Sequence, residues 1–222
     1  MLKCLIIPVT PFQQNCSLIW CENTKRGAVV DAGGDLPIVR QALEKNGVTL
    51  EKVLLTHGHF DHATAAGSLA AEFGVPIEGP HPDDRYLIEE LPEAGKKYNF
   101  PKEKPFLPDR WLADGETVTV GEVGFDVVHC PGHTPGHVVF VQPQVRLALV
   151  GDVLFRGSVG RTDFPRGNHD ALIHSIRGKL FPLGDDITFV PGHGQTSTFG
   201  WERKTNPYVA DMLFEDEDEA SP

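Results

Sequence analysis

The chain has 222 residues, 40% hydrophobic and 23% charged, which suits one large domain with a substantial core. Its 20 basic and 31 acidic residues give a formal charge of −11, which argues against a nucleic-acid partner. No apolar run approaches the roughly 20 residues that cross a bilayer, and the N-terminus shows no signal-peptide cleavage site. We therefore expect a cytosolic protein with no membrane partner.

Strand and helix patterns alternate along the first half of the chain. Runs rich in apolar and β-branched residues predict strands at 4–9, 16–20, 27–33 and 53–56. A helix is expected over 36–46, capped by Asp35 and ended by Gly47. A second helix is expected over 61–74, and a short one near 83–90 before a proline-containing surface loop.

The second half continues the alternation. Strands are predicted at 116–120, 125–129, 137–141, 146–150 and 186–190. Asn168 can cap a helix over 169–180. Alternating elements of this kind predict a layered α/β fold with helices covering sheet faces. We expect one domain over 1–209 and a disordered acidic tail over 210–222, where five consecutive acids stand together.

The stretch THGHFDH, residues 56–62, places four metal-binding side chains just after a predicted strand. His57 and His59 are two positions apart in an extended stretch, so their imidazoles point to the same side and can bind one ion together. Asp61 and His62 begin the next helix, which suits a second ion nearby. The alternative is a set of ordinary polar surface residues, and the carboxylate within the cluster makes that alternative the less favoured.

Further ligands are needed, because four side chains cannot complete two sites. Three ligand-type residues follow later strands, each in a glycine-containing turn: His133 in CPGHTPGH, Asp152 in VGD and His193 in PGHG. Function in layered α/β folds lies in loops that leave strand ends. The repetition therefore predicts that these loops complete a binuclear metal site.

The series T-H-x-H-x-D-H, G-H-T-P-G-H, G-D and P-G-H-G resembles the motifs of the metallo-β-lactamase fold superfamily. This resemblance implies an αββα sandwich of two mixed β-sheets flanked by helices. The stretches PVTPFQQNCSLIWCE, LTHGHFDH, LFRGSVGRTDFPRGN and KLFPLGDDITFVPGHG are similar to the hydroxyacylglutathione hydrolases (glyoxalase II), in particular the short second type found in bacteria. The implied activity is hydrolysis of S-lactoylglutathione to glutathione and lactate, as in methylglyoxal detoxification.

The resemblance also implies a role for each ligand-type residue. One metal is held by His57, His59 and His133, the second by Asp61, His62 and His193, and Asp152 bridges both. Two divalent ions are expected, with zinc usual in this superfamily and iron or manganese compatible with the same ligands. We expect His137 to support the site from behind the ligands, and His129 and Cys130 to be structural.

Two metals that share a carboxylate can share a water molecule and lower its pKa, so that hydroxide is available near neutral pH. They also stabilise the oxyanion that forms when a carbonyl is attacked. A thioester suits this chemistry, because a thiolate leaves without a strong general acid. Asp61 would orient the hydroxide as well as bind metal, so Asp61 and Asp152 are the candidate catalytic residues.

Residues 154–167 hold three arginines and one aspartate in an otherwise acidic chain. An arginine there can bind a carboxylate of glutathione, and the resemblance favours Arg161 over Arg156 and Arg166. The alternative is that these arginines pair with Asp163 or cover the surface. The expected partner is thus a small glutathione thioester, and a monomer is the favoured oligomeric state.

Three other functions stay open from the sequence. A persulfide dioxygenase shares this fold and a G-R-T-D-F stretch but uses one iron, whereas this chain keeps Asp61, His62 and His193 for a second ion. A lactonase or β-lactamase would cleave a different acyl bond. A non-catalytic binding protein would not need seven intact ligands.

Overall fold

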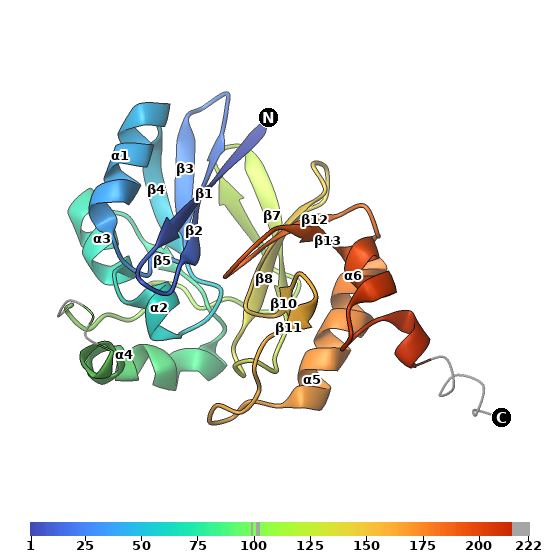
Figure 1. Ribbon diagram of the computed structural model, residues 1–222. Coiled ribbons are helices and arrows are strands. Elements are labelled where there is room, and N and C mark those ends of the chain that lie inside the picture. The colour runs from blue at the N-terminus through green and yellow to red at the C-terminus, as the bar shows by residue number, and fades with distance from the viewer. Residues whose placement is uncertain (99, 101–102, 215–222) are drawn as a thin grey trace.

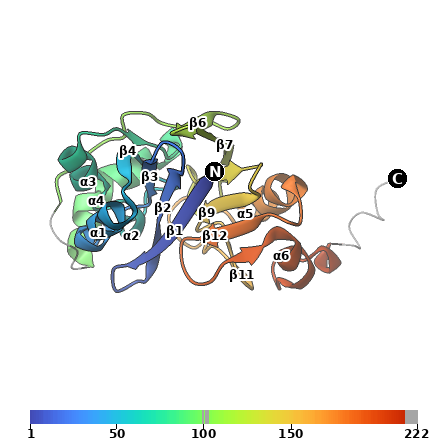
Figure 2. The same cartoon turned by 90° about the horizontal axis from the view of Figure 1, so that it is seen from above.

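Two β-sheets lie face to face between outer helices, as expected for an αββα sandwich (Figures 1 and 2). This computed structural model describes residues 1–98, 100 and 103–214. Each sheet is mixed, because parallel and antiparallel neighbours occur in both. The predicted fold class is therefore confirmed.

The first sheet has the order β1-β2-β3-β4-β5. Its strands are β1 (Leu2–Val9), β2 (Gln14–Cys21), β3 (Arg26–Val30), β4 (Thr49–Leu54) and β5 (Ile77–Glu78). The helices on its side of the molecule are α1 (Leu36–Asn46), α2 (Phe60–Ala63), α3 (Ala66–Phe73) and, after the 3-10 turn η1 (Pro82–Asp84), α4 (Arg85–Lys97). Every residue of β2 is buried, because this strand is covered on both faces.

The second sheet has the order β13-β12-β9-β8-β7-β6. Its strands are β6 (Thr117–Val120), β7 (Val123–His129), β8 (Val138–Gln142), β9 (Leu147–Gly151), β12 (Thr188–Pro191) and β13 (Ser197–Thr198). A separate hairpin is formed by β10 (Leu154–Phe155) and β11 (Ser158–Val159). The helical segments on this side are α5 (His169–His174), its π-helical continuation η2 (Ser175–Leu180), η3 (Phe181–Leu183), α6 (Phe199–Thr205) and η4 (Asp211–Leu213).

Three layers of apolar side chains hold the sandwich together. The central layer joins the two sheets and includes Ile19 and Leu54 from the first sheet and Phe125 and Phe140 from the second. The outer layers pack α1 and α3 on one side, and α5 and α6 on the other, against the sheets. Each fully buried aliphatic or aromatic side chain contributes about 1.5–3 kcal/mol to folding. The rigid sheets therefore fix where each inter-strand loop begins.

Helix α1 spans the predicted residues, but its cap differs from the expectation. Asp35 has a left-handed backbone (φ 48°) and makes no side-chain capping bond. Its carboxylate instead accepts a hydrogen bond from the Thr10 amide, 2.6 Å away, and so ties the β1–β2 turn to the start of α1. Asn168 does cap α5 as predicted, because its side chain accepts from the Ala171 amide at 2.9 Å.

The single helix expected over 61–74 is two short helices, α2 and α3. The amide of Ala65 donates to the carbonyl of Ala32, which lies in the loop after β3, and not to the turn of helix before it. This hydrogen bond to another loop interrupts the series of backbone hydrogen bonds along the helix, so α2 is a separate single turn. Asp61 and His62 thus stand on a one-turn helix fixed at its far end by another loop.

Other elements also differ from the predicted ones. Helix α4 runs to Lys97, longer than the expected 83–90, and α6 was not predicted. Residues 211–213 of the predicted tail form η4, and 215–222 lie outside the described residues. Among the helices that the structure describes, none combines the length and the apolar character needed to cross a bilayer.

Candidate metal centre

The segments that follow β4, β7, β9 and β12 meet at one edge of the sandwich. The loop after β4 carries four of the predicted ligands, and the loops after β7, β9 and β12 carry one each. The residues brought together are His57, His59, Asp61, His62, His133, Asp152 and His193. Gly192, beside the last of them, leaves no room for a side chain, because an added Cβ would lie 2.1 Å from Asp152 Oδ1.

The first set consists of His57, His59 and His133. Nδ1 of His59 lies 3.1 Å from Nε2 of His57 and 2.9 Å from Nε2 of His133. Burial and the neighbouring imidazole of His133 lower the pKa of His59 to about 3, and burial lowers the pKa of His57 well below its ordinary value. Neutral rings keep the lone pairs that metal ligation requires.

The second set consists of Asp61, His62 and His193. Oδ2 of Asp61 lies 3.2 Å from Nε2 of His193 and 3.9 Å from Nε2 of His62. Burial opposes a charge on His62, but the carboxylates of Asp152 and Asp61 outweigh it and raise its pKa well above the ordinary value. In each set one ligand atom per residue lies within 4.8 Å of the others.

Asp152 lies between the two sets, in the position expected of a bridge. Its Oδ1 is 3.3 Å from Nε2 of His62, and its Oδ2 is 3.6 Å from Nε2 of His133 and 3.9 Å from Nε2 of His193. Although burial alone would raise the pKa of Asp152, these imidazoles lower it. Its carboxylate is therefore ionised and reaches both sets.

The buried polar atoms at this centre fit bound cations. Nε2 of His62 and Oδ1 of Asp152 are buried and have no hydrogen-bond partner among the described residues. Buried polar atoms without partners are rare in folded proteins, because losing water costs about 1–3 kcal/mol per group. A cation between the sets would satisfy both atoms. Two His/Asp clusters around a shared carboxylate are typical of a binuclear site in the metallo-beta-lactamase superfamily.

Asp31 is a site residue that the sequence did not reveal. It accepts hydrogen bonds from the amide and hydroxyl of Thr56, at 2.8 and 2.7 Å, and its Oδ2 lies 3.0 Å from Nδ1 of His62. This contact fixes the ring of His62 with Nε2 turned to the second set, as carboxylates behind metal-bound histidines do. The only signal was an aspartate at the end of the predicted strand 27–33.

His137 contacts two of the predicted ligand residues, Asp152 and His57. Its Nε2 accepts a hydrogen bond from the Asp152 amide at 3.0 Å, and its ring stacks on His57 at 4.6 Å. It thereby fixes the backbone of the shared carboxylate. Cys130 is fully buried, and burial raises the pKa of its thiol, which fits the structural role expected of it.

Asp84 joins two of the ligand-bearing loops. Its carboxylate accepts from the Gly58 amide at 2.9 Å, from the Thr134 hydroxyl at 2.8 Å and from the Gly136 amide at 2.6 Å. Gly58 lies between two ligands of the first set, and Thr134 follows the third. This second buried aspartate was not foreseen either, since it lies in the 3-10 turn before α4.

Another cluster, formed by His81, Asp83 and His129, also has closely spaced nitrogen and oxygen atoms. The two rings stack nearly parallel, 4.1 Å apart, so their in-plane lone pairs do not converge on one point. Nε2 of His129 lies 2.8 Å from the Pro135 carbonyl. The cluster therefore supports the loop that carries His133.

Arg161 lies beside the first set but points its charge outward. Its backbone carbonyl is 2.7 Å from Nδ1 of His133, which fixes that ring. Its guanidinium forms a two-pronged ion pair with Asp163, at 2.9 and 2.7 Å, and lies 4.5 Å from the ring centre of Phe164. That ring contacts His59 at 4.9 Å. Of the other two arginines, Arg156 contacts Gln195, and Arg166 covers a tyrosine ring.

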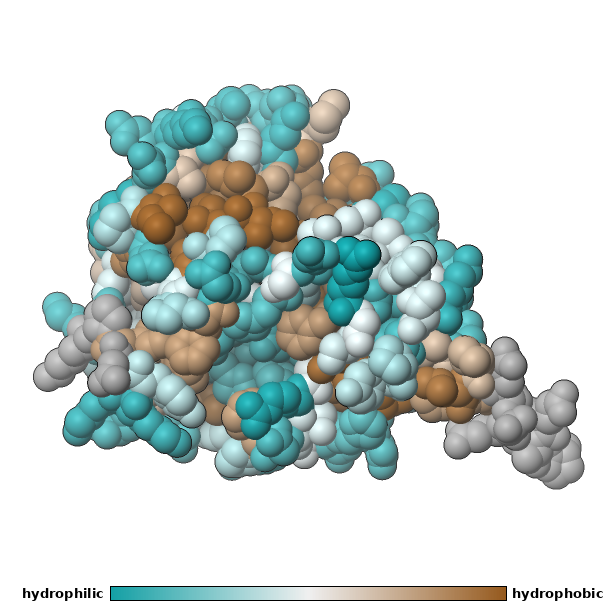
Figure 3. Space-filling view, viewed as in Figure 1, coloured by the Kyte–Doolittle hydropathy of each residue, from teal (hydrophilic) through white to brown (hydrophobic). Residues whose placement is uncertain are grey.

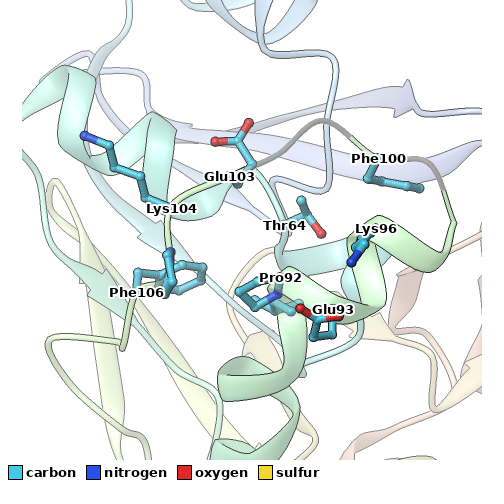
Figure 4. Close-up of a pocket in the computed structure, with 11 residues that line it drawn as sticks. Thr64, Pro92, Glu93, Lys96, Phe100, Glu103, Lys104 and Phe106 are labelled. Carbon is cyan, nitrogen blue, oxygen red and sulfur yellow. The ribbon is translucent and has the colours of Figure 1, made fainter.

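The surface around the centre is hollowed. Figure 3 shows hydrophilic side chains in a hollow near α2, with hydrophobic side chains on either side of it. A separate pocket of about 610 Å³ lies beside α4, with Phe100 and Phe106 at opposite ends (Figure 4). None of the seven residues of the two sets and the shared carboxylate lines this pocket.

Comparison with known proteins gives a consistent result. The sequence profile of the metallo-beta-lactamase superfamily matches residues 9–193. The chain is 48% identical over 205 residues to the hydroxyacylglutathione hydrolase GloC of Haemophilus influenzae, an alignment covering 92% of this chain and 96% of that protein.

Two solved structures are also similar. The B3 metallo-beta-lactamase BLEG-1 aligns with a TM-score of 0.85 and 32% identity, covering 94% of this chain and 99% of the other. The protein TTHA1623, in a di-iron-bound form, aligns with a TM-score of 0.84 and 35% identity, covering 92% and 100%.

Proposed function

The chain belongs to the metallo-beta-lactamase superfamily, and on that premise we propose that it hydrolyses glutathione thioesters with two bound metal ions. The observation that carries this proposal is Asp152 lying between two complete sets of ligand atoms. The relation to the GloC protein of Haemophilus influenzae supports a hydroxyacylglutathione as substrate, with S-lactoylglutathione as the favoured one.

We propose the ligand roles that the sequence suggested. His57, His59 and His133 hold one ion, Asp61, His62 and His193 the other, and Asp152 both. The donor set is imidazole and carboxylate without thiolate, which suits zinc and equally iron or manganese. The di-iron-bound relative supports two ions per chain but does not decide which metal this protein carries.

Two ions held by these residues would make hydroxide available near neutral pH and would polarise the substrate carbonyl. The chain's own residues orient and hold the reacting groups. Oδ2 of Asp61 lies at the second set, where it can accept a hydrogen bond from the attacking hydroxide and fix its direction. Asp31 and His137 hold His62 and Asp152 in place. The thiolate of glutathione then leaves without a protein acid.

The first experiment measures release of glutathione from S-lactoylglutathione by the metal-loaded protein. We expect turnover that is lost on chelation and restored by added metal. Asp152→Ala should abolish it and lower the content of both metals, while His133→Ala should affect mainly one. His169→Ala, which changes an exposed histidine on α5, should match the unmodified protein.

Assays with other substrates distinguish thioester hydrolysis from the alternative activities. The likeness to BLEG-1 makes a β-lactam the second substrate to try, and lactones and glutathione persulfide complete the set. No turnover of the thioester by metal-loaded protein, with good turnover of one of these compounds, would refute the proposed function. Oxygen consumption with glutathione persulfide by a one-iron protein would identify a dioxygenase.

A further inference from the structure

Asp84 is a buried aspartate at the start of α4 whose side chain does not cap that helix. It occupies the N-cap position, where an aspartate ordinarily accepts a hydrogen bond from an amide of the first turn, yet it makes no capping bond. Its side chain is fully buried. Because a buried carboxylate is stable only when it is well hydrogen-bonded, its partners indicate which part of the molecule it organises.

The three hydrogen bonds that Asp84 accepts all come from the loops of the first ligand set. The Gly58 amide, 2.9 Å from Oδ2, lies between two of the ligand histidines. The Thr134 hydroxyl, 2.8 Å from the same oxygen, belongs to the residue after His133. The Gly136 amide donates to Oδ1 at 2.6 Å. One carboxylate therefore connects the loop after β4 to the loop after β7.

The backbone around Asp84 is fitted to the same two loops. The His81 amide donates to the carbonyl of Gly136 at 3.0 Å. A Cβ added at Gly136 would lie 2.5 Å from the backbone nitrogen of Asp84, and one added at Gly58 would lie 2.7 Å from Cβ of Leu87. Glycine at both positions therefore lets η1 and the first turn of α4 lie directly against the ligand loops.

The second ligand set is supported by other contacts. The loop with His193 is held by the side chain of Asn15, which donates hydrogen bonds to backbone carbonyls on both sides of this histidine. Helix α2, which carries the other two ligands, is fixed by the bond from Ala65 to Ala32. The hydrogen bonds of Asp84 go to neither of these segments. The two sets are thus held in place by different parts of the fold.

We propose that Asp84 is a positioning residue for the metal ion of the first set and not for the ion of the second. By joining the two loops it holds their three histidines close together before an ion arrives, so binding does not have to order the loops. Loss of a hydrogen bond behind metal ligands typically weakens metal binding by roughly 10- to 100-fold. This inference rests on the proposed two-metal centre and adds that its ions depend on different supports.

The test measures the zinc affinity of each set separately, by competition with a chelating dye. His193→Ala leaves only the first set complete, and His59→Ala leaves only the second. Added to the His193→Ala protein, Asp84→Asn should lower the zinc affinity by roughly tenfold or more. The reason is that asparagine has the same size but turns an NH2 donor toward groups that are themselves donors. Added to the His59→Ala protein, Asp84→Asn should leave the zinc affinity unchanged.

Two further variants separate this role from general stability. Thr134→Val removes one of the three donors and leaves Asp84 in place, so it should also weaken zinc binding by the first set alone. Glu202→Gln is the matched control, because Glu202 is buried and accepts hydrogen bonds from the Gly157 amide and the Asn206 side chain, both at 2.8 Å. These partners do not adjoin any ligand residue in the chain, so both zinc affinities should stay unchanged.

An equal loss of zinc affinity in both single-set proteins would mean that Asp84 supports the fold as a whole, and would overturn the inference. Unchanged affinity of the first set would overturn it as well. If Asp84→Asn does not fold, Thr134→Val decides between the same outcomes. If the wild type binds no zinc, the proposed metal centre fails together with this inference. If it binds two zinc ions but does not hydrolyse the thioester, only the proposed function fails.

Discussion

The guanidinium of Arg161 is already paired in the absence of substrate. Asp163 holds it in a two-pronged ion pair in which both side chains are 66% exposed, and Phe164 lies under it. An exposed pair of this kind contributes little to stability, because water screens the attraction between the two charges. Its geometry instead keeps a planar donor beside the first ligand set, ready to exchange one carboxylate for another.

We predict that Arg161→Ala raises KM for S-lactoylglutathione by roughly tenfold or more without loss of metal. The reason is the loss of a charge-assisted hydrogen bond, which typically contributes about 1.5–3 kcal/mol. The backbone carbonyl that contacts His133 is unaffected by the change. Steady-state kinetics together with elemental analysis measures both quantities.

Arg40→Ala is the matched control, because Arg40 forms a similar two-pronged exposed pair with Glu72, between α1 and α3. Its KM should equal that of the unmodified protein. An unchanged KM in Arg161→Ala would mean that this loop does not recognise glutathione and that the arginine is surface charge.

At the scale of elements, Asp84 couples the loop after β4 to the loop before β8. Burial, the largest cause, raises the pKa of Asp84 to about 6 from 3.8, against the effect of its three hydrogen bonds. In a folded molecule the group therefore holds its proton at pH values where an unfolded chain has released it. The stability it contributes is fully present below about pH 3.8 and is lost as the pH rises through about 6.

We predict that the unfolding free energy of the wild type, relative to Asp84→Asn, falls by about 2 kcal/mol between pH 4 and pH 7. Asparagine does not titrate, and effects common to both proteins cancel in the difference. Urea denaturation at several pH values measures it. Asp126→Asn, a change at an exposed position on β7, should show the pH dependence of the wild type. If the difference in unfolding free energy between the wild type and Asp84→Asn does not change with pH, the pKa of Asp84 is not raised in the folded protein.

Sequence patterns predicted which helices and strands occur more accurately than they predicted where each one begins and ends. Helix α1 was predicted with its correct bounds because its apolar face and its stop residue Gly47 are local signals, although the expected capping bond from Asp35 is not made. The break between α2 and α3 was missed, since it depends on a hydrogen bond from Ala65 to Ala32. The seven ligand-type residues could be proposed from the sequence because four are closely spaced in residues 56–62 and the other three follow strands in glycine-containing turns, and the structure brings their side chains close together. Asp31 and Asp84 could not be proposed, because their partners lie at least 25 residues away in the chain.

At the scale of the molecule, the two ligand sets join its two halves. The first set takes His57 and His59 from the loop after β4 and His133 from the second sheet, and the second set combines Asp61 and His62 with residue 193 in the same way. Ions bound there would connect the sheets at one edge. Binding to the folded state alone stabilises it by about 4 kcal/mol at a free concentration a thousand times the Kd.

We predict about two metal ions per chain, each with the stabilisation given above, and a thermal midpoint that falls by roughly 16–32 °C when both are removed. Elemental analysis of protein isolated without chelator gives the first number, and calorimetry of loaded and stripped protein gives the second. Asp152→Ala should resemble the stripped protein in both measurements. A stable and fully active species with one iron would contradict the binuclear assignment.

Asn15, near the start of β2, holds the loop that carries His193 in place. Its side-chain amide donates hydrogen bonds to the carbonyls of Pro191 and Gly194, at 3.0 and 2.9 Å, and its backbone amide donates to the carbonyl of Gly192. These partners are separated by 176 and 179 residues. On a ribosome, the histidines of the first half emerge long before residues 191–194 are made. The first ligand set is complete once His133 is made, whereas the second set lacks His193 until translation is nearly finished. The two cation sites therefore become available in a fixed order along the growing chain.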